Sequence, residues 1–275
     1  MDDELGYKQR VADLYTRAAG SYGKIGPRLF QHVGRRLVEV AGVSPGSRVL
    51  DVATGRGAVL FAAAERVGPT GYVLGVDLAE GMVRATTAAI ARAGLTNAAV
   101  RLTDAEQLDL PPASFDAALC SFAIFCFPRP RLALSELRGA LRRGGVVGVA
   151  VASQSDPRWA WQNELFGRYA SVEEPPPGVL RGAALRRPGS LTSLLTDVGL
   201  VDARELREHA DFTWRSPDEW WDALWTHGTR RAVESMTPAA LDEFRAAVVA
   251  ELRRLQDGPG LTERFELTFA LAQRP

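Results

Sequence analysis

The sequence predicts an α/β protein with a doubly wound, mostly parallel sheet. Strand and helix signals alternate from Arg48 to about Ser153, which is typical of parallel sheets covered by helices. Near Arg48 an apolar strand runs directly into a glycine turn and a helix, and three consecutive strands end in a carboxylate. Ligands of open α/β sheets bind beyond the carboxyl ends of the strands, so we expect a ligand site at that edge.

The first strand and its turn are Arg48-Val-Leu-Asp-Val-Ala-Thr-Gly-Arg-Gly57. The apolar residues around Asp51 suit a strand buried on both faces. Gly55 and Gly57 leave room for a ligand close to the backbone, and the helix 58–67 begins with free N–H groups facing this corner. A buried carboxylate such as Asp51 is costly unless a ligand needs it, so the corner predicts a nucleotide-type ligand.

The next two strands repeat this pattern. The strand 72–77 ends in Asp77, 20 residues after Gly57, where a carboxylate can accept hydrogen bonds from both hydroxyls of a ribose. Asp104 follows the strand 98–103. Three neighbouring strands therefore deliver acids to one edge of the predicted sheet.

The remaining elements complete the alternation. We expect Gly144 and Gly145 to end the helix that precedes the fifth strand, and Gly199 to close the next helix. The predicted strands are 115–120, 146–151, 203–213 and 265–272, and the predicted helices are 129–141 and 191–198.

Five ordered blocks resemble the class I S-adenosylmethionine-dependent methyltransferases, of the type that methylates ubiquinone and menaquinone at carbon and of many bacterial small-molecule methyltransferases. The family's usual first glycine is Ala53 here. The resemblance implies a Rossmann-like, doubly wound, seven-stranded sheet with an antiparallel last strand, and S-adenosylmethionine as the cofactor. The blocks are Asp51–Gly57, Gly75–Met82, Asp104–Leu108, Ser114–Ala117 and Leu141–Gly145.

The resemblance also implies which residues contact the cofactor. Asp51 would face the methionyl ammonium, Asp77 the ribose hydroxyls and Asp104 the adenine amine. The other implied contacts are the turn residues Ala53, Thr54, Gly55 and Gly57, Leu78 and Met82 around the adenine, the backbone of Ala105 and Glu106 at its edge, Ser121 and Phe122 under the methionine chain, and Tyr15 and Tyr22 in a lid.

Each of these residues also has a purely structural interpretation. The glycines could serve only a tight turn, and Asp77 could cap the helix that starts near Glu80. Met82 at helical spacing from Leu78 is often a core residue, and Asp104 could be a solvated loop acid. The family match favours the ligand role in each case.

The chain is predicted to form a single methyltransferase domain over residues 1–275. Residues 1–44 would form an N-terminal helical lid and 45–153 the cofactor-binding core, while helical cap inserts at 154–188 and 216–260 would form the substrate pocket. The six tryptophans all lie between Trp159 and Trp225. They could simply pack the cap, or they could form an apolar wall for a bulky, aromatic or polyketide-like substrate. Ser216 and Glu219 mark the start of one cap helix, and the second insert should hold two helices.

Methyl transfer depends on holding the acceptor in line with the donor, so no obligatory catalytic motif is required. An oxygen, nitrogen or carbon acceptor can still need a general base, for which histidine is suited. His227 and His32 are the candidates, and His209 in a predicted strand has a structural interpretation. Cys120 and Cys126 are expected to be reduced core thiols, and no metal site is expected.

Composition excludes several function classes. The 33 basic and 33 acidic side chains cancel, which argues against nucleic acid or an anionic membrane as the partner. The acidic start lacks an apolar signal run, and no stretch is apolar enough to span a bilayer, so we expect a cytoplasmic protein. The expected partner is a small-molecule substrate, and the sequence leaves a monomer and a homodimer both open.

Three alternative functions remain to be weighed. A cofactor-dependent cyclase would bind S-adenosylmethionine without transferring its methyl group, and a binding protein would turn nothing over. A nicotinamide-dependent oxidoreductase fits less well. Position 60 is leucine where the dinucleotide fingerprint has its third glycine, and Asp51 would repel a pyrophosphate.

Overall fold

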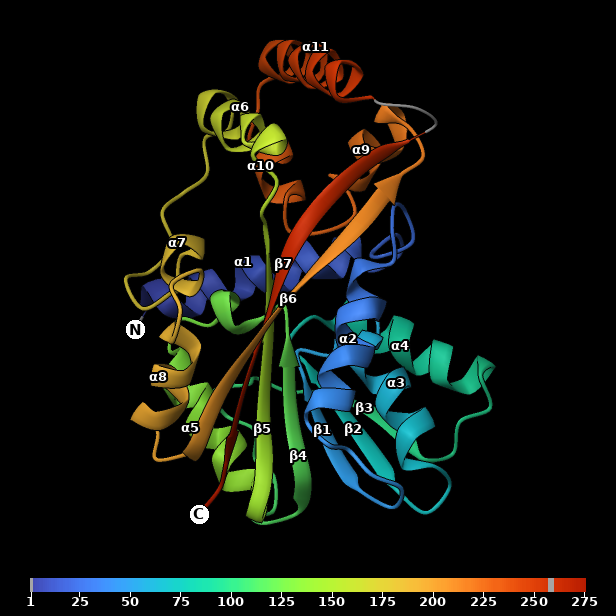
Figure 1. Cartoon of the computed structure of the whole chain (residues 1–275), viewed down its shortest axis with the longest axis vertical. Helices are drawn as coiled ribbons and strands as arrows, with labels where there is room; N and C mark the ends of the chain where they lie inside the picture. The colour runs from blue at the N-terminus through green and yellow to red at the C-terminus, as the bar shows by residue number, and fades with distance from the viewer. Residues whose placement is uncertain (1, 257–259) are drawn as a thin grey trace.

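The computed structural model describes residues 2–256 and 260–275, whose seven strands form one sheet in the order β3-β2-β1-β4-β5-β7-β6 (Figure 1). Strands β1 to β5 run parallel, and β7 lies antiparallel between β5 and β6. This confirms the predicted fold, including its antiparallel last strand. The strands are β1 (Arg48–Val52), β2 (Tyr72–Asp77), β3 (Ala98–Leu102), β4 (Phe115–Ser121), β5 (Leu141–Gln154), β6 (Val201–Trp214) and β7 (Leu261–Gln273).

Helices cover both faces of the sheet, each over its own apolar core. Helices α2 (Leu29–Val40), α3 (Ala58–Val67) and α4 (Glu80–Arg92) bury their apolar sides with one face. Helices α5 (Pro130–Ala140) and α8 (Ser190–Asp197) do the same on the other face. The sheet is therefore the middle layer of three, with its carboxyl edge left for a site.

The end of α5 differs from the sequence prediction. Leu141 is extended and pairs with Phe115, so α5 ends at Ala140 and β5 begins at once. Gly144 has φ of 74° in the irregular start of β5, where the register with β4 shifts, and it does not cap the helix. The glycines thus serve a bend inside a strand, which the same pair of residues can also signal.

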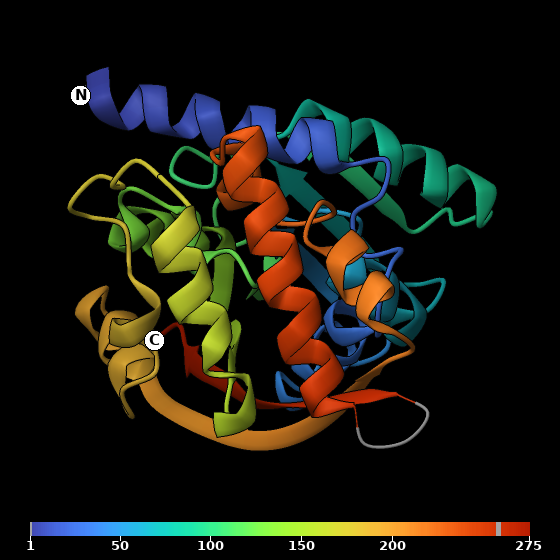
Figure 2. The ribbon, with the colours of Figure 1, turned by 90° about the horizontal axis from the view of Figure 1, so that it is seen from above.

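Helix α1 (Asp2–Ala18) runs along one side of the molecule beside α4, at the upper margin of Figure 2. The backbone N–H of Gly81 in α4 donates to Thr16 Oγ1 at 3.2 Å. The predicted lid over residues 1–44 is therefore too long, because α2 belongs to the layer that covers the sheet. The part before α2 lies at the carboxyl edge, together with the first residues of α2, Leu29, Phe30 and Gln31.

The upper ends of β5, β6 and β7 extend beyond the sheet into a cap of helices (Figure 1). The cap contains α6 (Trp161–Tyr169), α9 (Pro217–Ala223), α10 (Arg230–Glu234) and α11 (Pro238–Leu255). The described part of 216–260 holds three helices and not the predicted two, and 257–259 lie outside the described residues. Ser216 does cap α9, accepting from Glu219 N at 3.1 Å.

The insert 154–188 divides between two places. Its first part, including a short 3₁₀ turn (Pro157–Trp159) and α6, packs in the cap. Its last part, α7 (Gly182–Leu185), contributes Leu185 to the core beneath α5 and α8. Of the helices in residues 2–256 and 260–275, none combines the length and the apolar character that crossing a membrane requires.

The contact between α2 and α3 gives a first prediction. A Cβ at Gly34 would lie 2.7 Å from Ala58 O and 2.8 Å from Ala58 C, both backbone atoms. Gly34→Ala should therefore lower the free energy of unfolding by about 1–3 kcal/mol through overpacking. Gly167→Ala, at an exposed position of α6, is the control, since nothing lies within 4 Å of its Cβ, and it should be neutral or stabilising. Equal stability of the Gly34 variant and the wild type in urea unfolding would contradict this packing.

Candidate active site

Two adjoining cavities open where β1, β2 and β4 end. The larger, about 90 Å³, is lined by Tyr15, Tyr22, Ala53, Gly55, Asp77, Leu78, Met82, Asp104, Ala105, Ser121 and Phe122, among others. The smaller, about 50 Å³, shares Tyr22, Ala53, Gly55, Ser121 and Phe122 with it and adds Asp51 and Thr54. The structure thus brings together all but two of the residues that the resemblance implied for the cofactor.

Asp77 organises the junction between β1 and β2. Its Oδ2 accepts from the backbone N–H of Gly55 at 2.8 Å, and its Oδ1 accepts from that of Ala79 at 2.9 Å. Burial raises the pKa of this carboxyl, and these N–H groups oppose the effect. Asp77 therefore fixes the glycine turn and the start of α4, as its structural interpretation expects, and it also lines the larger cavity.

The turn after β1 and the end of β4 are held in left-handed backbone conformations. Ala53 has φ of 55°, Gly55 of 52° and Phe122 of 56°. Only glycine adopts this region without cost, and an L-residue such as Ala53 loses about 1–2 kcal/mol there. The motif's usual glycine at position 53 therefore has a conformational reason. Strained residues of this kind cluster at ligand sites, where the backbone must present its groups to a ligand.

The smaller cavity holds a buried acid and two unpaired polar atoms. Asp51 Oδ2 accepts from Thr54 Oγ1 at 2.6 Å and from the N–H of Leu60 at 3.0 Å, while burial raises the pKa of Asp51 to about 7. Ser121 Oγ and Gln31 Oε1 are buried without a hydrogen-bond partner among the residues described. Buried polar atoms normally have partners, so this cavity fits a polar, cationic group such as an amino-acid end.

Gly57 and Glu106 do not line these cavities. Gly57 is the left-handed N-cap of α3, and a Cβ there would meet Phe61 at 2.8 Å, so its role is local packing. The N–H of Glu106 donates to Asp104 Oδ1, and its buried carboxylate accepts from Arg129 N. The backbone N–H of Glu106 is thus already used within the chain, which contradicts its implied place at the adenine edge.

Lys8 of α1 was missed by the sequence analysis. Its ammonium lies 2.7 Å from Asp104 Oδ2 and 2.6 Å from Glu106 Oε2, and the residue lines the larger cavity. Burial alone would lower the pKa of Lys8, but the hydrogen bonds to the two carboxylates outweigh it, so the pKa is raised. Lys8 thus stays charged and ties α1 down beside the cavity.

A third cavity of about 370 Å³, which we call the large cavity or acceptor cavity, lies between these two cofactor cavities and the cap. It shares Tyr15, Tyr22 and Phe122 with the larger cofactor cavity. Its wall is mainly apolar. Its residues come from the segment before α2 and the start of α2, from the ends of β4, β5, β6 and β7, from α6, and from α9 and the loop that follows it. The lining includes Ile25, Pro27, Leu29, Phe30, Phe125, Trp214, Trp220, Leu224, Phe265, His227, Thr229, Gln154, Gln162 and Glu263.

His227 lines this cavity as a neutral imidazole. Burial lowers its pKa to about 4, and its Nδ1 lies 3.0 Å from Thr229 Oγ1. The Thr229 hydroxyl already donates to Leu224 O at 2.8 Å. Because a hydroxyl has one proton, Nδ1 must be the donor to Thr229, which leaves Nε2 as an acceptor. This assignment follows from the hydrogen-bond network.

The structure does not bring His32 to any of these cavities. It is exposed on α2, and its ring lies edge-on against Phe212 of β6 at 5.6 Å. Only Trp214 and Trp220 of the six tryptophans line the large cavity. Trp159, Trp161, Trp221 and Trp225 pack the core of the cap. All six tryptophans thus pack in the core of the cap, and Trp214 and Trp220 line the cavity as well.

The fold and the cavities together define a class of protein, the Rossmann-like enzymes that hold a nucleoside cofactor at the carboxyl edge of the sheet. Residues 49–145 match the family described as methyltransferase domain. The chain is 37% identical over 256 residues to nocamycin O-methyltransferase of Saccharothrix syringae, which covers 88% of this chain and 89% of that protein. It belongs to the class I S-adenosylmethionine-dependent methyltransferases.

Two further comparisons cover different shares of the chain. It is 37% identical over 142 residues to the aklanonic acid methyltransferase DauC of Streptomyces, which spans 52% of this chain and 64% of that protein. The crystal structure of the cyclase SpnF matches with a TM-score of 0.59 at 18% identity, covering 99% of this chain and 95% of that one. A likeness at this identity shows a shared fold alone.

The family match and the two methyltransferase relatives show the activity. The protein is an enzyme that transfers a methyl group from S-adenosylmethionine to a small molecule.

The Lys8 cluster gives a second prediction. Lys8→Met should destabilise the protein by about 2 kcal/mol or more, because it leaves the buried carboxylate of Glu106 with one cation fewer. Arg84→Met is the matched control, since the pair of Arg84 with Glu80 is largely exposed and should contribute about 0.5 kcal/mol at most. Urea unfolding of both variants measures the difference. Equal effects would contradict the role of Lys8 in holding α1.

The raised pKa of Asp51 gives a third prediction. Its pKa is about 7 in the folded protein, against 3.8 for an ordinary aspartate, so between pH 4 and 7 the native state binds more protons than the unfolded state. Stability from this group is therefore lost as pH rises through that window, by an amount on the order of 4 kcal/mol. Asp51→Asn should flatten this part of the pH profile of cofactor-free protein. A profile identical to that of the wild type would show that Asp51 does not titrate there.

Proposed function

We propose that this protein methylates an oxygen atom of a bulky, mainly apolar, aromatic small molecule. The large cavity carries this proposal, because it shares Tyr15, Tyr22 and Phe122 with the cofactor cavities. Its volume and apolar lining suit a multi-ring ligand. The oxygen acceptor is taken from the nocamycin O-methyltransferase, which is similar along nearly its whole length.

The residues of the two smaller cavities fit the proposed cofactor. S-adenosylmethionine would supply a methyl group on a positively charged sulfur. Asp77 would accept from the ribose hydroxyls, Asp51 and Ser121 would hold the amino-acid end, and Leu78 and Met82 would flank the adenine. An ammonium beside Asp51 would favour its charged form, which offsets the cost of burying that carboxylate.

Asp104 has a more restricted role in this proposal than the resemblance implied. Its Oδ2 already accepts from Lys8 and its Oδ1 from Glu106 N, so it would offer the adenine amine only its remaining lone pairs. Ala105 beside it lines the cavity and would contact the base. Tyr15 and Tyr22 would separate the cofactor from the acceptor cavity and exclude water from it.

His227 would orient the acceptor and take its proton. An Nε2 acceptor facing a hydroxyl would direct an oxygen lone pair toward the methyl group, and positioning of this kind supplies much of a methyl-transfer rate. A hydroxyl oxygen becomes a strong acid as it gains a methyl group, so even an imidazole with a pKa of about 4 can accept the proton. The proton thus leaves the oxygen for Nε2 as the new carbon–oxygen bond forms.

The relatives favour methyl transfer over cyclisation. The similarity to methyltransferases rests on 37% sequence identity, whereas the cyclase SpnF shares the fold at 18%. The test is to incubate the purified protein with S-adenosylmethionine and polycyclic phenols, and to identify products by mass spectrometry and NMR. An O-methyl product formed one to one with S-adenosylhomocysteine supports the proposal. An N-methyl, C-methyl or unmethylated isomerised product contradicts it.

The two histidines give a fourth prediction. His227→Gln should lower kcat for O-methylation by about 10²–10⁴, the usual contribution of a general base, with unchanged affinity for S-adenosylhomocysteine. His32→Gln is the matched control, because His32 is exposed against Phe212 and should leave kcat as it is. Steady-state kinetics and calorimetric binding measure the two effects. If both variants kept the wild-type kcat, neither histidine would take part in the reaction.

A further inference from the structure

Glu263 occupies a position on β7 where an apolar residue is expected. Alternate residues face the interior at this end of the strand, since Leu261 and Glu263 are buried while Thr262 and Arg264 are exposed. Glu263 is 3% exposed. A charged residue at an inward position breaks the period-two pattern of a strand, and such breaks are expected at functional sites.

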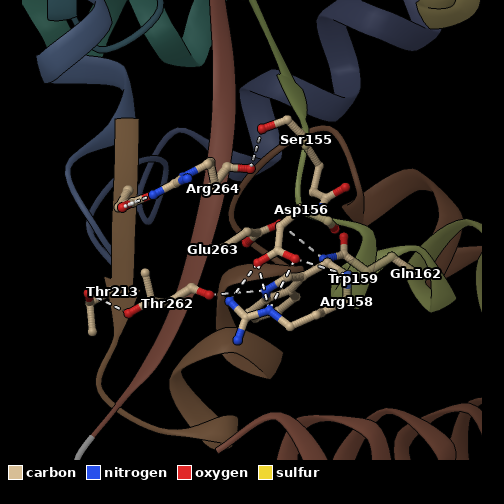
Figure 3. Close-up of polar contacts among 11 residues, drawn as sticks. Ser155, Asp156, Arg158, Trp159, Gln162, Thr213, Thr262, Glu263 and Arg264 are labelled. Carbon is tan, nitrogen blue, oxygen red and sulfur yellow. Dashed lines mark hydrogen bonds and ion pairs between the residues drawn. The ribbon is translucent and has the colours of Figure 1, made fainter. Parts of the chain in front are cut away.

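The carboxylate of Glu263 is held between the sheet and the cap. Its Oε1 accepts from Gln162 Nε2 of α6, and its Oε2 accepts from Trp214 Nε1 of β6, each at 3.0 Å. Figure 3 shows the side chains of Glu263 and Gln162 pointing toward one another from β7 and α6, while Trp159 turns to bond the backbone of Thr262. Two elements thus aim one carboxylate into place.

Both Glu263 and Gln162 line the large cavity, beside Trp214 and Trp220. An ionised carboxylate has about four acceptor positions, and these two hydrogen bonds use two of them. Burial raises the pKa of Glu263 to about 7, against the effect of its bonds to Trp214 and Gln162. A wall that only had to be apolar would not need a buried carboxylate, whose burial costs free energy even with these two donors.

Glu263 and His227 both line this cavity but contact different elements. The His227 ring lies 6.2 Å from that of Phe30, which in turn contacts Tyr22 and Phe122 at the cofactor cavities. Glu263 packs instead with Gln162 and Trp214 beneath the cap. A ligand that places its acceptor at His227 would therefore present another part of its frame to Glu263.

We propose that Glu263, positioned by Gln162, binds a hydrogen-bond donor on the substrate, a hydroxyl group remote from the oxygen that is methylated. This inference rests on the proposed function of the same cavity. The substrate is then a flat, apolar frame with a polar group at each end. Above pH 7, where Glu263 is ionised, an acceptor-only group such as an ether or ketone would face a carboxylate without a proton to share and be rejected.

Two rigid probes separate this hydroxyl from the rest of the frame. In the presence of S-adenosylhomocysteine, 2,6-dihydroxyanthraquinone carries hydroxyls at both ends, and 2-hydroxyanthraquinone lacks the second. Calorimetry above pH 8, where Glu263 is ionised, should show the dihydroxy probe binding the wild type about tenfold or more tightly, the usual effect of a hydrogen bond to a charged group. Glu263→Leu should abolish this preference while still binding S-adenosylhomocysteine.

Two further variants keep the test decisive. Gln162→Leu should weaken the preference as well, which covers the case that Glu263→Leu does not fold. Glu266→Leu is the matched control on β7, since Glu266 pairs with Arg207 and does not line the cavity, and it should keep the full preference.

The outcomes also distinguish this inference from the proposed function. Equal binding of the two probes to the wild type, no binding of either, or a preference that survives in Glu263→Leu would overturn the role of Glu263 alone. A protein that bound neither S-adenosylhomocysteine nor any phenol would instead overturn the proposed function. A preference lost only in the Glu263 and Gln162 variants is the expected result.

Discussion

The structure of this site depends on burying two carboxylates, Asp51 and Asp77, at the ends of neighbouring strands. Such burial is costly unless backbone donors compensate it, and here the compensation comes from N–H groups of Gly55, Leu60 and Ala79. The N–H of Gly55 lies in the left-handed turn after β1, that of Leu60 in the first turn of α3, and that of Ala79 just before α4. The glycine motif, the two acids and the start of α3 are therefore one structural unit, and a change in any part would displace the others.

A second constraint concerns the way in which the third cavity is closed. The sheet alone would leave its carboxyl edge open to solvent. The strands β6 and β7 continue past that edge into the cap, and the cap covers the cavity (Figure 1). They carry Trp214 and Glu263 up to α6, where Gln162 meets them. The β6–β7 pair is thus both the last part of the sheet and part of the wall of the acceptor cavity, which links the stability of the fold to the shape of the cavity.

The sequence predicted the sheet and the cofactor edge well, because both depend on local signals. Val49 to Gly57 is a strand, a turn and a helix start within ten residues, and Asp77 follows at a fixed distance. Lys8, Gln31 and Glu263 were missed because their roles arise from contacts across long stretches of chain. Lys8 meets Asp104 from 96 residues away, and its helix gave no motif of its own.

His32 and Glu263 show the same limit from opposite directions. The position of His32 in the N-terminal segment suggested a lid, but α2 turned out to pack on the sheet and to carry His32 to its outer side. Glu263 lies in a polar run, Thr262-Glu-Arg264, and such a run in a sequence indicates a surface position. Its burial depends on where the cap lies, and only the tertiary structure determines that.

The polar groups of the acceptor cavity bear on how selectivity and catalysis are divided. An apolar wall discriminates weakly between similar frames, since one methylene is worth only about 1–3 kcal/mol, whereas a buried acceptor left unpaired rejects an analogue far more strongly. His227 lies near the residues shared with the cofactor cavities, and its Nδ1 is fixed by Thr229. Glu263 lies on the cap side and is fixed by α6 and β6. A substrate held at both points has its acceptor oxygen placed by the distance between them, so recognition at the cap would set the geometry of transfer at the cofactor.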